Sequence, residues 1–105
     1  LAPALERIND EIRNGVIPKV AELADLCNMS AASFRRSFEK TLGLSPKAYI
    51  TRCAIHKAKK LLACTNIPIT QIAAQIGYEN ISGFNRCFLE QTGMSPSAFR
   101  KMTQN

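Results

Sequence analysis

Residues 69–100 read ITQIAAQIGYENISGFNRCFLEQTGMSPSAFR, and most of the landmarks in this stretch occur once before in the chain. The earlier copy precedes it by 50 residues. The repeat pairs Phe34 with Phe84, Arg36 with Arg86, Phe38 with Phe88, Gly43 with Gly93, Ser45 and Pro46 with Ser95 and Pro96, and Tyr49 with Phe99. Agreement at this many positions does not arise by chance. The chain therefore contains two copies of one unit.

The segment in front of this repeat also recurs, but at an offset of 49 residues. The matching apolar pairs are Val20 and Ile69, Leu23 and Ile72, Ala24 and Ala73, and Cys27 and Ile76. Within each copy they fall at i, i+3, i+4 and i+7, the spacing of one buried helix face. The shift from 49 to 50 predicts that the turn after this short helix is one residue longer in the second copy.

The rest of the chain follows the same helical period, and no stretch shows the sustained alternation of a β-strand. A first helix carries Leu5, Ile8 and Ile12 and ends at Gly15. A long fourth helix begins after a serine cap with Pro46 at its first position, and it extends to about Cys64. The buried stripe of this fourth helix is predicted to consist of Tyr49, Cys53, Ala54, Ala58, Leu61 and Leu62. The prediction is an all-α fold of about seven helices.

Each copy consists of a short helix, a tight turn and a second helix, which is the helix-turn-helix arrangement. The alternative is an ordinary helical hairpin that serves packing alone. Duplication favours DNA binding, because two recognition helices on a rigid connector can enter major-groove segments ~34 Å apart. We predict a first helix-turn-helix subdomain at 1–45, a linker helix at 46–64 and a second subdomain at 65–105, with recognition helices at about 31–42 and 82–92.

Charge is distributed unevenly along the chain. Residues 1–25 hold five acidic and three basic side chains, whereas residues 26–105 hold three acidic and eleven basic ones. An excess of Lys and Arg is typical of proteins that bind polyanions, because neutralising phosphates releases counterions. Basic surfaces also serve solubility, acidic partners and anionic membranes. Charge alone therefore supports, but does not assign, nucleic-acid binding.

The helical period places specific side chains on the outer face of each recognition helix. At ~100° per residue, Phe38 lies ~40° from Phe34, whereas Arg36 lies ~200° away and points outward. Arginine can form two hydrogen bonds with guanine, and asparagine can do so with adenine. The predicted base-reading residues are Ala32, Arg35, Arg36, Ser82, Asn85 and Arg86. A single exposed arginine is usually only solvated, but the equivalence of Arg36 and Arg86 favours function.

Phosphate contacts are expected near helix N-termini and at neighbouring basic side chains. The predicted phosphate-binding residues are Ser30, Ser33, Lys40, Lys47 and Asn80. The linker-helix residues Arg52, Lys57, Lys59 and Lys60 are expected mainly to keep that helix soluble. The four phenylalanines of the recognition helices are expected in the core and not as base-stacking platforms.

The cysteines and the single histidine indicate neither a metal site nor an enzyme. Cys27, Cys53, Cys64 and Cys87 are 26, 11 and 23 residues apart, without the close pairs of structural zinc sites. We expect reduced thiols in or near a core and no cofactor. No nucleophile and base stand at a recognisable spacing. With no signal peptide or membrane-length apolar run, we expect a cytoplasmic protein without membrane contact, and the start at Leu1 suggests a fragment.

Residues 69–100 resemble the signature of AraC/XylS-type bacterial transcription regulators. The resemblance rests on an I-A pair, a G-aromatic turn, F-x-R-x-F, G-x-S-P and a terminal aromatic-Arg. Residues 21–46, AELADLCNMSAASFRRSFEKTLGLSP, resemble the family's first unit, so the likeness extends over residues 4–103. It implies two homeodomain-like three-helix subdomains on a linker helix. It also implies an N-terminal sensing or dimerisation domain, and activation of transcription through RNA polymerase.

Two positions depart from the family pattern. Ala54 stands where many members have a basic linker-helix residue, so a phosphate contact is not implied there. Gly83 stands where members often have an aromatic residue, so we expect the second recognition helix to begin less rigidly.

The alternative function is a basic helical module that docks on an acidic protein. Preference for one operator over bulk DNA, typically ~10³ to 10⁷-fold for a sequence reader, separates the two.

Overall fold

The computed structural model describes residues 1–104, which form seven α-helices and no strand. The helices are α1 (Ala2–Arg13), α2 (Val20–Leu26), α3 (Ala31–Leu42), α4 (Pro46–Cys64), α5 (Ile69–Gln75), α6 (Ile81–Thr92) and α7 (Pro96–Thr103). The all-α prediction is confirmed. The first recognition helix has the predicted bounds, and the second begins one residue earlier than predicted.

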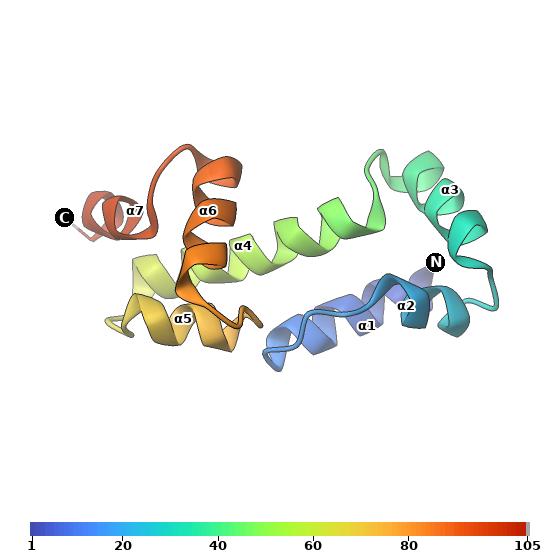
Figure 1. The fold of residues 1–105 in the computed structure, drawn as a ribbon, viewed down its shortest axis with the longest axis horizontal. Helices are drawn as coiled ribbons and strands as arrows, with labels where there is room; N and C mark the ends of the chain where they lie inside the picture. Colours follow the sequence, from blue (N-terminus) through green and yellow to red (C-terminus); the bar gives the residue numbers. More distant parts are fainter. Residues whose placement is uncertain (105) are drawn as a thin grey trace.

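The long helix α4 joins two groups of helices along an elongated molecule of 46 × 23 × 21 Å (Figure 1). α1, α2 and α3 lie at one half of α4, and α5, α6 and α7 lie at the other half (Figure 1). We call the first group with the start of α4 unit one, and the second group with the end of α4 unit two.

Each unit has its own hydrophobic core. The core of unit one contains Ala4, Ile8, Ile12, Leu23, Ala24, Phe34, Phe38 and Ile50. The core of unit two contains Ile55, Ala58, Leu62, Ile72, Ala73, Ile76, Phe84 and Phe88. The predicted stripe of α4 was partly wrong, because Ile50 and Ile55 are buried while Tyr49, Cys53 and Leu61 are only half-buried. A helix that serves two cores buries different faces at its two ends.

The second half of α4 repeats α1. At the same offset of 50, Ala54 matches Ala4, and Leu62 matches Ile12, each buried in the same way as its counterpart. The match at Ala58 is Ile8, a much larger side chain. α4 therefore supplies unit two with the helix that α1 supplies to unit one, which is how two small cores share one element.

Side-chain caps start the helices that carry the repeat. Ser30 Oγ accepts a hydrogen bond from the Ser33 amide at 3.2 Å, and Ser45 Oγ accepts one from the Ala48 amide at 3.1 Å. In unit two, Asn80 Oδ1 caps α6 through the Gly83 amide at 2.8 Å. These caps satisfy amides that have no partner within the helix. The serine cap predicted before Pro46 is confirmed at Ser45.

The four cysteines are free thiols, and the prediction that all lie in or near a core is wrong for Cys64. Cys64 is exposed because it is the last residue of α4, beyond the buried Leu62.

Among the described residues, no group of three or more His, Cys, Asp or Glu side chains could hold a metal ion. Within residues 1–104, no helix combines the length and apolar character that a bilayer crossing requires.

Candidate nucleic-acid interface

The two recognition helices present their side chains in the same way. Each position from 30 to 42 has the same degree of burial as its counterpart from 80 to 92. In Figure 1, α3 and α6 both run from the lower to the upper part of the view, on opposite halves of α4. The two helices therefore offer matching surfaces on the two halves of one molecule.

All six predicted base-reading side chains are exposed: Ala32, Arg35 and Arg36 on α3, and Ser82, Asn85 and Arg86 on α6. In the part of the chain that the structure describes, none of the three arginines makes a hydrogen bond or ion pair. Their guanidinium groups keep all five N–H donors for a ligand. Both helices therefore carry arginines that are free to bind the edge of a base.

Three contacting aromatic rings fix each recognition helix on its unit. On α3, the ring of Phe38 lies 5.6 Å from Phe34 and 5.5 Å from Tyr49 of α4. On α6, the ring of Phe88 lies 5.8 Å from Phe84 and 5.5 Å from Phe99 of α7. The phenylalanines are buried, as predicted. The same packing therefore sets the direction of Arg36 and of its counterpart in unit two.

The turn between the two helices differs between the units. Four residues separate α2 from α3, and five separate α5 from α6, which confirms the predicted extra residue. In unit two the extra length brings Tyr78 beside the recognition helix, where its ring lies 5.7 Å from Phe84. The start of α6 therefore has an additional aromatic support that α3 lacks.

The predicted phosphate-binding residues occupy three different settings. Ser30 and Asn80 are exposed caps, and each uses a side-chain oxygen as an acceptor for its helix. Their hydroxyl and amide hydrogens remain available as donors. Lys40 is exposed in the last turn of α3, whereas Ser33 is half-buried. These residues surround the ends of α3 and α6, where an adjacent DNA backbone would pass.

Lys47 is not on α3 but follows its end by five residues, at the start of α4. It is exposed in the first turn of α4. With Thr51 of α4 and with Tyr78 and Glu79 of unit two, it lines an open hollow between the units. This position suits contact with a phosphate that lies between two half-sites, the two DNA segments that face α3 and α6. It suits contact with a phosphate inside either segment less well.

Leu89 is a surface residue that the sequence prediction missed. Its side chain is 52 % exposed although leucine is apolar. On the helical wheel it lies ~140° from Phe84, between Asn85 and Ser82. With Asn85 and Arg86 it lines an open hollow beside Pro96. An apolar side chain at this place can contact the methyl group of thymine.

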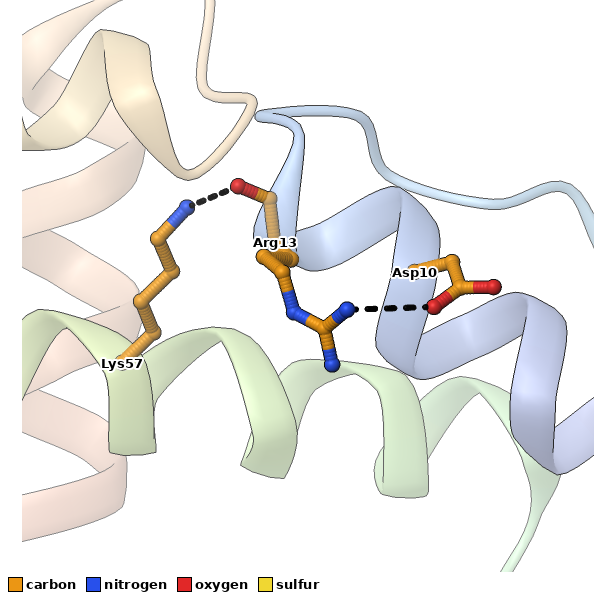
Figure 2. Close-up of polar contacts among 3 residues, drawn as sticks. All are labelled: Asp10, Arg13 and Lys57. Carbon is orange, nitrogen blue, oxygen red and sulfur yellow. Dashed lines mark hydrogen bonds and ion pairs between the residues drawn. The ribbon is translucent and has the colours of Figure 1, made fainter.

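The basic residues of α4 do not share one role. Arg52 and Lys60 are exposed, and Lys59 is half-buried. The prediction that Lys57 serves solubility is wrong, because its ammonium group donates hydrogen bonds to the carbonyl oxygens of Ile12 at 2.8 Å and Arg13 at 3.0 Å. Figure 2 shows the bond to Arg13. Periodicity placed Lys57 outside the stripe but could not show that α1 and α5 end beside it.

Arg100, the last residue of the family-like signature, also has a structural role. Its Nε donates to the carbonyl oxygen of Leu62 and one of its terminal nitrogens to that of Thr65, both at 3.2 Å. Gln104 donates to the same two oxygens at 2.8 and 2.7 Å. The end of α4 is therefore capped by α7 of the same unit.

The sequence profile of a helix-turn-helix domain family matches residues 23–102, most of the chain. The chain belongs to the AraC-type family of helix-turn-helix DNA-binding domains. The resemblance found in the sequence is thereby confirmed. Over 82 residues, this AraC-type domain is 38 % identical to the bifunctional transcriptional activator/DNA repair enzyme AdaA of Bacillus subtilis. It is 30 % identical over 82 residues to the RCS-specific transcriptional activator RclR of Escherichia coli.

These matches cover 78 % of the chain, but 39 % of AdaA and 29 % of RclR. The domain thus spans well under half the length of these relatives. Its fold is also similar to that of the DNA-binding domain of AdpA, solved in complex with a target DNA, with a TM-score of 0.88 and 23 % identity. That likeness covers 96 % of this chain and 89 % of the AdpA chain. The two-unit arrangement on one long helix is therefore the fold of the family.

Proposed function

We propose that this AraC-type domain reads a two-part site on one DNA duplex, with α3 and α6 in adjacent segments of the major groove. The observation that carries the proposal is the equivalent exposure of Arg36 and Arg86, neither of which has a partner within residues 1–104. Each arginine donates two hydrogen bonds to a guanine in its half-site. Arg35, Asn85, Ala32 and Ser82 contact neighbouring base edges.

The two half-sites contribute unequally to affinity. The exposed face of α3 carries Arg35, Arg36 and Lys40 against Glu39, whereas that of α6 carries Arg86 against Glu90. Because phosphate neutralisation supplies much of the binding free energy, the more basic α3 binds its half-site more tightly. α6, with Asn85 and Leu89 on its face, adds discrimination between bases more than overall attraction.

Contacts with the DNA backbone hold the domain in position on the two half-sites. Ser30 and Asn80, at the N-termini of the recognition helices, donate to phosphates beside each half-site, with Ser33 and Lys40 close to them. Lys47 binds a phosphate between the half-sites. Backbone contacts of this kind position a protein on DNA without reading its sequence.

The whole protein has further parts. The chain spans less than half the length of the relatives above, and we propose that an N-terminal sensing or dimerisation domain completes it. Both relatives are named transcriptional activators, which supports activation through contact with RNA polymerase as the role of the full regulator. We place this regulator in the bacterial cytoplasm.

Selection of bound duplexes from a random pool tests the proposed function. The expected result is one enriched sequence with two conserved parts, and competition by bulk DNA at least ~10³-fold weaker than by the selected site. A matched variant with both Arg36 and Arg86 replaced by alanine should bind without this preference. Equal competition by all sequences would favour the alternative, a basic module that docks on acidic proteins.

A further inference from the structure

The two units touch each other at a second place besides α4. There, the segment after α1 lies against the segment after α5. A Cβ atom at Gly15 would lie 2.8 Å from the carbonyl oxygen of Gln75, and one at Gly77 would lie 2.6 Å from Cγ1 of Ile17. Both glycines have positive φ angles, +80° and +95°. The units therefore approach so closely that neither glycine position has room for a side chain.

Lys57 lies beside this contact and binds both units. Its Nζ donates to the carbonyl oxygen of Ile12 at 2.8 Å and to that of Arg13 at 3.0 Å in unit one (the latter drawn in Figure 2), and to that of Gln75 in unit two at 3.3 Å. An ammonium group has three hydrogens, so these three acceptors use all of them. The acceptors stand at the C-terminal ends of α1 and α5, where carbonyls lack the i+4 partner of a continuing helix and carry partial negative charge. The Ile12 oxygen also accepts from the Gly15 amide at 3.1 Å.

Partial burial of the Lys57 ammonium group costs hydration free energy that an exposed lysine keeps. Burial lowers the pKa of the Lys57 ammonium group from its usual value, because water is partly removed from the charge. The three carbonyl oxygens offset that loss. The end of α4, equivalent to the end of α1, is capped by Arg100 and Gln104 of its own unit. A helix end of this kind can thus be capped by side chains of its own unit alone. The bond from Lys57 to the other unit is not needed for capping.

We infer that Lys57, together with the contacts of Gly15 with Gln75 and of Ile17 with Gly77, forms an inter-unit clasp that fixes the angle between α3 and α6. Lys57 is a positioning residue for DNA recognition and sets which spacing of half-sites the domain accepts. The inference rests on the two-part reading proposed above. A helix as long as α4 bends at low cost, and a small bend between the cores moves the distant recognition helices apart.

The first test measures the orientation of the units without DNA. Residual dipolar couplings of backbone N–H groups in the full chain report how unit one is oriented relative to unit two. In the wild-type chain one alignment tensor should fit both units. In Lys57→Met, which keeps the stem but loses the charge, and in Ile17→Ala, which opens the clasp without altering α4, each unit should need its own tensor.

The exposed residue Lys60 supplies the control, since it is on the same helix and makes no hydrogen bond or ion pair in the described part of the chain. Lys60→Met should behave like the wild-type chain. If both Lys57→Met and Ile17→Ala also fit a single tensor with unchanged orientation, the clasp does not set the angle and the inference is wrong. A folded core in each variant is checked by couplings that, taken one unit at a time, still fit the wild-type structure of that unit.

The second test measures binding to DNA of altered spacing. Starting from the site selected by the wild-type chain, one base pair is added or removed between the half-sites, which rotates them by ~35° relative to each other. The wild-type chain should lose affinity roughly tenfold or more at each altered spacing, as linked sites do when geometry prevents joint binding. Lys57→Met should bind the best site more weakly and discriminate among the spacings only about threefold or less.

The outcomes separate the clasp from the proposed function. If the wild-type chain depends on spacing and Lys57→Met shows the same dependence, the clasp inference is overturned while two-part reading stands. If the wild-type chain itself binds all spacings and each half-site alone equally well, the two-part reading is overturned. Affinity for one isolated half-site should stay the same in both chains, because the recognition faces are unaltered.

Discussion

Arg36 and Arg86 occupy the same place on two copies of one structural unit: each lies midway between two buried phenylalanines and projects from the opposite face of its helix. In a protein that merely needs solubility, the two positions could diverge to any polar residue. Here the charge, the exposure and the packing beneath are all preserved. That combination is what a pair of half-sites with similar bases requires.

Replacing Arg36 by alanine should cost roughly 1 to 3 kcal/mol of binding free energy and relax the preference at one base pair. The loss arises because the paired donors to a guanine disappear while the helix is unchanged. Arg86→Ala should relax one base pair in the other half-site. Binding measurements on the selected site and its single-base variants check both. Equal losses on every DNA sequence would refute a base-reading role.

Lys47→Ala should behave differently from the arginine variants. A lysine that binds a phosphate contributes to all sequences alike, so affinity should fall uniformly and the slope of log K against log salt should flatten by about one. Titrations of the selected site and of an unrelated duplex over a series of salt concentrations measure this. The exposed Lys101 on α7 supplies a comparison with the same charge change. A loss confined to the selected site would contradict the proposed phosphate contact.

The sequence predicted those features that depend on local periodicity. The helix-turn-helix pairs and the outward direction of Arg36 follow from the spacing of apolar residues around Phe34 and Phe38. The longer second turn follows from a change of offset. These properties belong to single helices and short turns, so a repeat within one chain is enough to reveal them.

Features that depend on how the two units meet were not predictable in this way. Lys57 was assigned to solvent because its helical angle is outside the apolar stripe, but the ends of α1 and α5 happen to cover that side. The second half of α4 repeats α1, yet Ala58 replaces the bulky Ile8 and hides the match. Tertiary contacts override the helical wheel at both places.

The cysteines should differ in reactivity. Cys64 is exposed, whereas burial raises the pKa of the half-buried Cys53 thiol above its usual value. Because the thiolate is the reactive form, Cys53 has less of it at neutral pH and should react with iodoacetamide at least ~tenfold more slowly than Cys64. The reaction rate at Cys53 should still rise with pH at values where an ordinary thiol is already fully ionised and reacts at a constant rate. Peptide mass mapping over time checks the order, and equal rates would contradict the structure.

Gly83 is the place where a single substitution should stabilise the domain. It lies in the first turn of α6, and a Cβ atom there would meet Asn80 Oδ1 at 3.4 Å and Cδ1 of Tyr78 at 3.8 Å, both ordinary contact distances. Alanine restricts the unfolded chain and favours the helix, so Gly83→Ala should raise the free energy of unfolding by roughly 0.5 to 1 kcal/mol.

Thermal unfolding measures the effect, since ~1 kcal/mol corresponds to ~4 to 8 °C in Tm for a domain of this size. Gly77→Ala is the matched control, because the same atoms are added at a positive φ and against Ile17, and Tm should fall. If the two variants shift Tm in the same direction, the geometry given for the start of α6 is wrong. A rise for Gly83→Ala with unchanged DNA preference would show that the glycine makes this helix less stable without taking part in base reading.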